Sequence, residues 1–419
     1  MGAWERREDA KNLTLIAVSG VLGALLTGAL FIGRDMSAHR NFQNFRAMHS
    51  PRYAGTMYRF EPSAPPTSAG PIYGRVRTVD GREITGFIRW DRNEGSWTDI
   101  LDAAKVTWHG RETVSGVRFG QIRAIQVQGP HYGLLTLRSG QHVEMAGVTS
   151  DLGEDVRGIV VTEPDGRRTE LCWDEVDFVE FLRAPQGVRL PAARLYGTLT
   201  TRSGQTFTGR IGWNMDDIST SDFLGSGGPG SRQRVSFGAI RRIVRDGPDA
   251  ARVVLRSGEQ VTLRGTPDVG SANDGITVSD PALGQVKVDW RDFDNVTFSA
   301  PPRDARAVTF DGGRPITGTV LTDSGEALTG TVRWDHDEAS TWEMLNGSAA
   351  GADFEVEFGQ IARIRKAGRG ATVTLKDGRS FELSGSNDVD GGNRGILVNT
   401  GSEVRRVSWS AFKELRLDD

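Results

Sequence analysis

Apolar and polar residues alternate in short runs along most of the chain after residue 70, and Gly-containing turns separate the runs. One pattern, G-x-[VL]-x-T-x-x-G-x-x-[IFL]-T-G-x-[IV]-x-W, occurs at residues 74–90, 197–213 and 318–334. Alternation on both sides of a D-G or S-G pair predicts a β-hairpin. Because the whole pattern recurs, the chain is predicted to contain three tandem repeats.

Each repeat contains a second, shorter unit built in the same way. Its hairpin turns are centred on Gly140, Gly258 and Gly378. It closes with W-x-x-[VF]-x-x-[VL]-x-[FL], and the first unit closes with the same spacing from Phe119. The change of spacing between the last two strands suits a single 3₁₀ turn. We therefore expect an all-β chain of six modules in three pairs, at residues 71–184, 194–300 and 314–419.

The order of elements in a module is a hairpin, a middle strand, and then a strand, a 3₁₀ turn and a strand. It resembles the small five-stranded barrel of the Src-homology (SH3) and Sm-like families, over residues 72–418. The resemblance implies six tandem small β-barrels in three pairs. It is one of pattern and size, and no ligand-binding residue of those families can be matched here. Small modules bury little core alone, which favours the pair as the folding unit.

The N-terminal part has a different character. After a charged flank at residues 1–12, residues 13–33 carry no charged side chain, which is the length of a transmembrane helix. A signal peptide fits less well, because the apolar run is long and its flank has no net charge. Residues 34–70 form a basic and then Pro-rich tether whose basic side chains suit lipid headgroups. Small residues line one face of the predicted helix and favour packing against another helix: Ser19, Gly20, Gly23, Ala24, Thr27 and Gly28.

This layout predicts a single-pass protein of the bacterial inner membrane. We expect the globular part on the periplasmic side. The positive charges on the two flanks of residues 13–33 are nearly balanced, so the cytoplasmic orientation stays open.

Composition and chemistry point away from catalysis. A net charge of −3 with 37% hydrophobic and 25% charged residues is typical of a globular chain and excludes a collagen, a coiled coil or a polycation. Arg is spread among acids, so we expect no nucleic-acid partner. The six His lack ligand spacing, and Cys172 has no basic motif beside it. We expect no enzyme activity, no cofactor, no metal and no small-molecule substrate.

Two groups of acidic residues recur with the repeats. Glu94, Asp217 and Glu338 follow the Trp of the first hairpin, and a Ser-x-x-[DE] pattern comes next, which predicts a short capped helix. The second group lies at residues 151–155, 268–274 and 388–393, where Asp and Asn beside Gly predict turns. Ca²⁺ binding by these carboxylates is the alternative for both groups.

Six of the ten Trp lie at repeat-equivalent positions and are expected in the core. The Trp of the insertions after the first hairpin have less reason to be buried in their own module, so they are expected to contact a neighbouring module or an external partner. With two aromatic residues of the tether, they form the candidate partner contacts: Trp97, Trp108, Trp342, Phe42 and Phe45.

Taken together, these features predict a non-catalytic, membrane-anchored scaffold or accessory subunit. Its repeats would brace the extrinsic surface of a larger complex of integral membrane protein subunits. The plan of one helix and an extrinsic β domain is similar to that of the H subunit of photosynthetic reaction centres, so a photosynthetic or other energy-transducing host is expected. The alternative is a cell-envelope protein that binds glycan or peptidoglycan through the avidity of repeated barrels.

Overall fold

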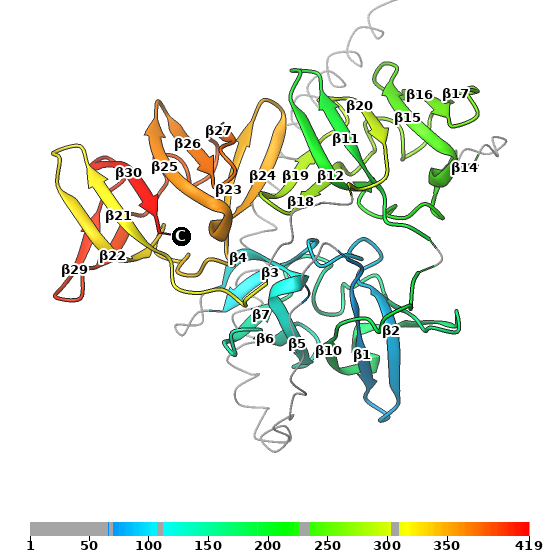
Figure 1. The fold of residues 1–419 in the computed structure, drawn as a ribbon, viewed down its shortest axis with the longest axis horizontal. Helices are drawn as coiled ribbons and strands as arrows, with labels where there is room; N and C mark the ends of the chain where they lie inside the picture. Colours follow the sequence, from blue (N-terminus) through cyan, green and yellow to red (C-terminus); the bar gives the residue numbers. More distant parts are fainter. Residues whose placement is uncertain are drawn as a thin grey trace, which may run out of the picture. The chain divides into compact units, whose positions relative to one another are not determined.

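The computed structural model describes residues 66, 70–106, 112–190, 192–225, 234–302 and 310–418. All of them belong to one compact unit, Ser63–Thr107 with Arg111–Asp419. The described residues form thirty strands and four single-turn 3₁₀ helices, which confirms the all-β fold (Figure 1). None of these residues lies in a helix long and apolar enough to cross a membrane. The predicted anchor at residues 13–33 and most of the tether lie outside the described residues.

Each of the three repeats contributes ten strands. Repeat 1 contains β1 (Tyr73–Thr78), β2 (Glu83–Arg89), β3 (Ile100–Val106), β4 (Glu112–Arg118), η1 (Phe119–Gln121), β5 (Ile122–Val127), β6 (Tyr132–Leu137), β7 (His142–Ala146), β8 (Ile159–Thr162), β9 (Arg168–Leu171), η2 (Trp173–Glu175) and β10 (Val176–Phe181). Repeat 2 contains β11 (Tyr196–Thr201), β12 (Thr206–Trp213), β13 (Phe223–Gly225), β14 (Arg234–Ser236), η3 (Phe237–Ala239), β15 (Ile240–Arg245), β16 (Ala250–Leu255), β17 (Gln260–Arg264), β18 (Ile276–Asp280), β19 (Gly284–Val288) and β20 (Phe293–Phe298). Repeat 3 contains β21 (Thr317–Thr322), β22 (Ala327–Arg333), β23 (Met344–Ala349), β24 (Ala352–Glu357), η4 (Phe358–Gln360), β25 (Ile361–Ala367), β26 (Gly370–Leu375), β27 (Ser380–Leu383), β28 (Ile396–Asn399), β29 (Val404–Val407) and β30 (Phe412–Leu417). The expected 3₁₀ turn is present at four positions, whereas the chain makes a plain turn at Trp290 and Trp409.

In repeat 1 the two modules are interleaved in one open sheet. In repeat 1 the strand order is β4-β3-β7-β6-β5-β10-β1-β2-β8-β9. The first hairpin, β1–β2, pairs with β8 of the second module, and the second hairpin continues into β3 of the first module. The last strand, β10, joins the halves by pairing with β1 and β5. In repeats 2 and 3 the second module likewise gives its middle hairpin to the first, whereas β13–β14 form a separate sheet and β23–β24 join the sheet of repeat 2. The prediction of six small β-barrels was therefore wrong, because the sheets are open and the modules exchange strands.

Pairs of glycines explain part of the repeated pattern. Gly74 lies opposite Gly86 in the β1–β2 hairpin, and the equivalent glycines face each other in repeats 2 and 3. A Cβ on Gly74 would lie 2.5 Å from the Glu180 carbonyl oxygen, and one on Gly86 would lie 2.3 Å from that of Thr162. Larger residues would separate β1 and β2 from the strands on either side of them, so only glycine fits.

The repeat-equivalent Trp residues are central to the core, as predicted. Trp90 meets Trp173 edge to face at 6.3 Å between ring centroids, and the other two repeats contain the same pair. Five of these six Trp are buried, and Trp409 is partly buried against the same core. Edge-to-face geometry adds to the stabilisation that burial gives such rings.

Repeats 2 and 3 share a sheet. Strand β24 of repeat 3 pairs with β19 of repeat 2 over five residue pairs, from Gly284↔Val356 to Val288↔Ala352 (Figure 1). Phe354 of β24 packs edge to face on Phe207 of β12 at 5.6 Å. As a result, the buried apolar residues of the two repeats form one continuous cluster.

Candidate functional site

A tight turn follows the central Trp of each repeat. In repeat 1, Trp90 and Glu94 form an antiparallel bridge, and the backbone between them passes through left-handed conformations at Asp91 (φ 43°) and Arg92 (φ 66°). The same turn, again with two positive φ values, begins at Asn214 in repeat 2 and Asp335 in repeat 3. Asp and Asn tolerate this conformation better than most residues, which accounts for their position directly after the Trp.

The predicted capped helix after this turn does not form. The Asp99 carboxylate accepts hydrogen bonds from the N–H groups of Gly95 and Ser96 at 2.8 Å, which is one half of the capping box. The chain then enters strand β3 at Ile100. Asp222 and Glu343 make the same contacts before β13 and β23. The helix prediction was wrong because alternating apolar residues of β3 are buried in the sheet and outweigh the local signal.

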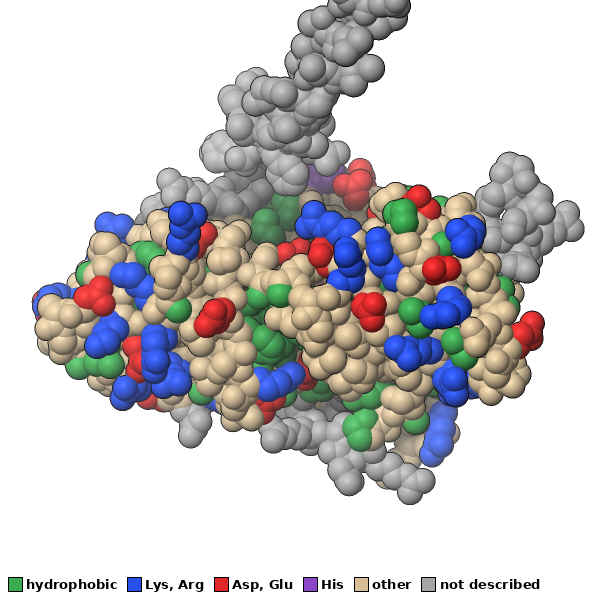
Figure 2. Space-filling view, turned by 90° about the horizontal axis from the view of Figure 1, so that it is seen from above, with side chains coloured by type: hydrophobic (Ala, Val, Ile, Leu, Met, Phe, Trp, Pro, Cys, Tyr) green, Lys and Arg blue, Asp and Glu red, His purple; other side chains and the backbone are tan. Residues whose placement is uncertain are grey.

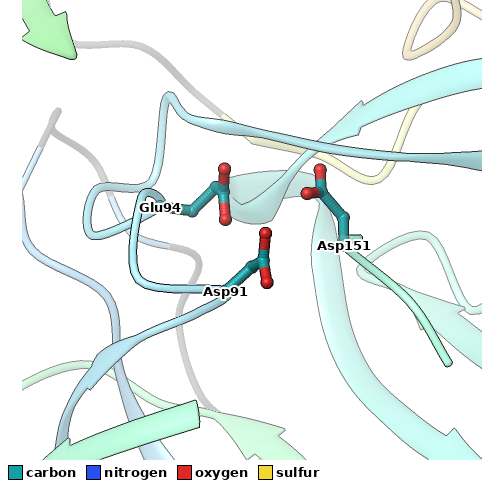
Figure 3. Close-up of side chains that lie close together, drawn as sticks. All are labelled: Asp91, Glu94 and Asp151. Carbon is teal, nitrogen blue, oxygen red and sulfur yellow. The ribbon is translucent and has the colours of Figure 1, made fainter. Parts of the chain in front are cut away.

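Three carboxylates from the two acidic regions meet beside this turn. Ligand oxygens of Asp91, Glu94 and Asp151 all lie within 4.8 Å of one another, and all three residues are buried (Figure 3). Asp91 and Glu94 come from the turn after β2, and Asp151 comes from the loop after β7. We call these three residues the acidic cluster.

Two members of the acidic cluster have well-defined partners. The Arg157 guanidinium donates two hydrogen bonds to Asp91, at 2.8 and 3.0 Å, and Ser150 Oγ donates a third at 2.7 Å. Asp151 accepts the Asp102 N–H at its Oδ2 at 2.8 Å, and its backbone carbonyl accepts the Trp90 indole N–H at 2.7 Å. These bonds tie the loop after β7 to the core Trp and to β3.

Glu94 is different. Its side chain points toward the other two carboxylates (Figure 3), and its Oε2 is buried with no hydrogen-bond partner among the described residues. Burial raises the pKa of Glu94 well above its usual value, and the neighbouring Asp151 and Asp91 raise it further. Burial and Asp102 also raise the pKa of Asp151. The cluster therefore favours a bound proton or cation over three free charges.

Repeat 3 has the same set of side chains. Burial, followed by Asp388 and Asp337, raises the pKa of Glu338 to about 11. Burial raises that of Asp388 to about 7. The Arg394 guanidinium binds Asp335 at 2.7 Å, as Arg157 binds Asp91.

Repeat 2 keeps the turn with different partners. Asn214 replaces the Asp, and Asp274 stands in the place of the Arg. The Asn214 side-chain oxygen accepts the Asp274 backbone N–H at 2.9 Å. The Arg–Asp ion pair of repeats 1 and 3 is thus replaced by a neutral contact in repeat 2. Burial raises the pKa of Asp217 to about 8, and the neighbouring Asp216 and Asp268 contribute to the increase.

A second polar region joins the three repeats. The Arg118 side chain of repeat 1 is fully buried and donates to the carbonyl oxygens of Pro281 (2.8 Å) and Asp280 (3.1 Å) in repeat 2. It also lies 3.4 Å from Glu357 of repeat 3, which accepts a hydrogen bond from Gln121 at 2.7 Å.

Four further ion pairs of the described residues connect the repeats, among them Arg89 with Asp222 of repeat 2 at 3.0 Å and Arg379 of repeat 3 with Asp280 of repeat 2 at 2.6 Å. Arg194 of repeat 2 binds Asp99 at 3.1 Å, and Lys105 pairs with Glu343 of repeat 3. Separating the repeats would leave these buried charges without their partners, which is energetically costly. The contacts therefore hold the repeats in a fixed geometry.

The structure encloses two of the candidate partner contacts. Trp97 lies against Phe181 at 6.2 Å, with the Arg138 guanidinium 5.8 Å from its ring. Trp342 of repeat 3 is buried in the apolar cluster of repeat 1, together with Phe310. Both rings therefore contact residues of this chain. Trp108, Phe42, Phe45 and the small residues of the predicted transmembrane face lie outside the described residues.

Several residues of these sites were not singled out from the sequence, namely Asp91, Arg157, Arg118 and Glu357. A signal for the first two exists within the repeats, because Asp and Arg occur together in repeats 1 and 3 and are both replaced in repeat 2. Charged residues of both signs are interspersed on the face shown in Figure 2. Comparison with known proteins gave no matching family model, no matching curated protein and no matching solved structure.

Proposed function

We propose that this chain is a non-catalytic, membrane-anchored scaffold that braces the extrinsic surface of a larger membrane protein complex. The observation that carries the proposal is the way the repeats are joined. The β19–β24 pairing and the buried Arg118 contacts hold the repeats in one unit. A scaffold needs surfaces at fixed separations, whereas binding by avidity alone needs only a linker of suitable length.

The proposed anchor is the uncharged segment at residues 13–33. Its small-residue face would pack against a helix of an integral membrane subunit, and the basic part of the tether would lie at the lipid headgroups. We place the repeats on the periplasmic side of a bacterial inner membrane. The proposal includes no cofactor, substrate or nucleic acid, and the host is a photosynthetic or other energy-transducing complex, by analogy with the plan of the reaction-centre H subunit.

We further propose that each half-sheet is a small barrel-like unit related to the SH3 and Sm-like type. Support comes from the strand order β10-β1-β2-β8-β9, in which a hairpin is flanked by a last strand and a middle hairpin. In that order β1 and β2 come from the first module and β8, β9 and β10 come from the second, as an exchange between two such units would give.

The test is extraction of the full chain in mild detergent, affinity purification and quantitative mass spectrometry. We expect integral membrane subunits at a fixed stoichiometry. A Gly20→Leu variant should reduce their recovery, because Gly20 lies on the small-residue face. Ala29→Leu is the matched control, since Ala29 falls on the opposite face of the predicted helix. Release of the chain together with peptidoglycan, without membrane subunits, would favour the glycan-binding alternative and refute the scaffold.

A further inference from the structure

We propose that the acidic cluster of Asp91, Glu94 and Asp151 binds a divalent cation that prefers oxygen ligands, of the class of Ca²⁺, Mg²⁺ and Mn²⁺. The proposal is independent of the scaffold function. It rests on an orphaned carboxylate, on the balance of charge at the cluster and on the recurrence of an orphaned Glu beside an anchored Asp in repeat 3.

The first argument is the Glu94 side chain itself. It is only 6% exposed, its Oε2 has no hydrogen-bond partner among the described residues, and it is directed at two other carboxylates (Figure 3). A buried polar atom without a partner is costly, and a buried like-charged neighbour adds to the cost. A cation held between the carboxylates removes both costs.

The second argument is charge. Asp91 is already neutralised by the two hydrogen bonds from Arg157. Asp102 and Glu355, both close to Asp151, share the Lys287 ammonium as their favourable neighbour. Glu94 and Asp151 therefore have no cation of their own, and a divalent cation would offset their charges. Carboxylate oxygens are the ligands that hard divalent cations select.

The third argument is the supply of ligand atoms. Asp151 uses Oδ2 for the Asp102 N–H, which orients the side chain and leaves Oδ1 free to bind. Glu94 offers both oxygens, and Asp91 lies within the same 4.8 Å. The partners of Asp91 and Asp151 fix the geometry in the way that outer-shell hydrogen bonds hold the ligands of known metal sites.

Repeat 3 provides an internal comparison. Glu338 is 7% exposed, and its Oε2 likewise has no hydrogen-bond partner among the described residues. Asp388 accepts the Asn346 N–H as Asp151 accepts that of Asp102. An orphaned Glu beside an anchored Asp is thus produced twice by different surrounding sequences, which argues against an accident of one loop.

The test is a titration of the full chain in detergent, freed of metal by a chelator that is then removed. Ca²⁺, Mg²⁺ and Mn²⁺ are added separately and followed by calorimetry. Tb³⁺ serves as a luminescent probe, because Trp90 donates to the Asp151 carbonyl and can transfer excitation to a nearby ion. All titrations are also made in a Glu338→Gln background, which removes the orphaned carboxylate of repeat 3. We expect saturable binding by at least one cation and sensitised Tb³⁺ emission that this cation displaces.

In that background Glu94→Gln should weaken binding at least about tenfold, since even the loss of an outer-shell partner has that effect. Asp151→Asn is a second variant that keeps an oxygen to accept the Asp102 N–H. Glu163→Gln is the matched control, because Glu163 pairs with Arg167 away from the cluster. Far-UV circular dichroism confirms folding of each variant. The proposal fails if the chain binds no cation, if both cluster variants bind as tightly as the background, or if Glu163→Gln weakens binding equally.

Discussion

The acidic residue of the loop after the second hairpin has the same structural role in every repeat. The backbone carbonyls of Asp151, Asp268 and Asp388 accept the indole N–H of the central Trp at 2.7–2.9 Å. Their carboxylates accept a backbone N–H at the start of the middle hairpin. One residue thus connects the core Trp, a loop and a strand, which explains why Trp and Asp recur together.

Asp217 is the residue at which the cost of a partly buried carboxyl can be measured. Its pKa is about 8, against 3.8 for the free side chain. Between these values the folded chain holds a proton that the unfolded chain releases, so stability falls as the pH rises through this window. Asp217→Asn should remove that dependence and raise the free energy of unfolding at pH 7 by on the order of 1–3 kcal/mol.

The measurement is urea denaturation of the full chain in metal-free buffer at several pH values from 4 to 9. Asp274→Asn is the control, because the exposed Asp274 contacts Asn214 through its backbone N–H, which the substitution retains. Stability curves for wild type and Asp217→Asn that run parallel across this range would contradict the assignment.

At the residue scale the sequence predicted that the repeated Trp are buried in the core. It did not predict which carboxylates face one another. The burial of Trp90 and its equivalents follows from the alternation of apolar and polar residues within one hairpin. Glu94 faces Asp151, which lies far away in sequence on the loop after β7. The pairing of strands in the sheet brings this loop next to the turn that contains Glu94 (Figure 3). The Ser-x-x-[DE] pattern predicted a short capped helix; its acidic residue does accept the Ser N–H, but a strand follows instead of a helix.

At the scale of elements, one strand decides which repeats share a sheet. Val286 of β19 is buried and faces Phe354 across the β19–β24 pair. In repeat 1 the residue equivalent to Val286 is Thr169, which pairs with Val161. In repeat 3 it is Arg405, which is exposed and pairs with Val398. An apolar residue allows another strand to cover the edge, whereas a charged one discourages pairing.

Phe354 tests this junction. Phe354→Ala removes the ring that packs on Phe207 and on Phe381 (5.0 Å), so it should lower the free energy of unfolding by about 3–5 kcal/mol. Phe223→Ala is the matched control, because Phe223 is 43% exposed, and should cost far less. Chemical denaturation of both variants gives the comparison. Equal losses would mean that β24 adds little to the core of repeat 2.

At the scale of the whole molecule, the described repeats are connected by polar contacts as well as by the shared sheet. Arg118 contacts repeat 2 through two carbonyl groups and repeat 3 through Glu357. Such contacts couple the unfolding of one repeat to the next, as neighbour interfaces do in repeat proteins.

Arg118→Met tests the coupling. It leaves Glu357 buried without its cation, and we expect a loss of roughly 3–5 kcal/mol together with a broader or divided thermal transition. Arg118→Met with Glu357→Leu should recover part of the loss, since no charge is then left buried. Arg291→Met is the control, because that exposed side chain pairs with its sequence neighbour Asp292 and its loss should cost under about 1 kcal/mol. A single, unshifted transition in Arg118→Met would show that the repeats are not coupled through this residue.

The sequence by itself determined the all-β fold, the hairpins and the threefold repetition, because these depend on alternation and turn residues within a few positions of one another. It also indicated that a pair of modules folds together. Only the tertiary structure decided that the second module of each repeat gives its middle hairpin to the first, that β24 joins β19, and that Glu94 faces Asp151. Those choices depend on register and on contacts between residues far apart in the chain, where local patterns carry no information about the partner.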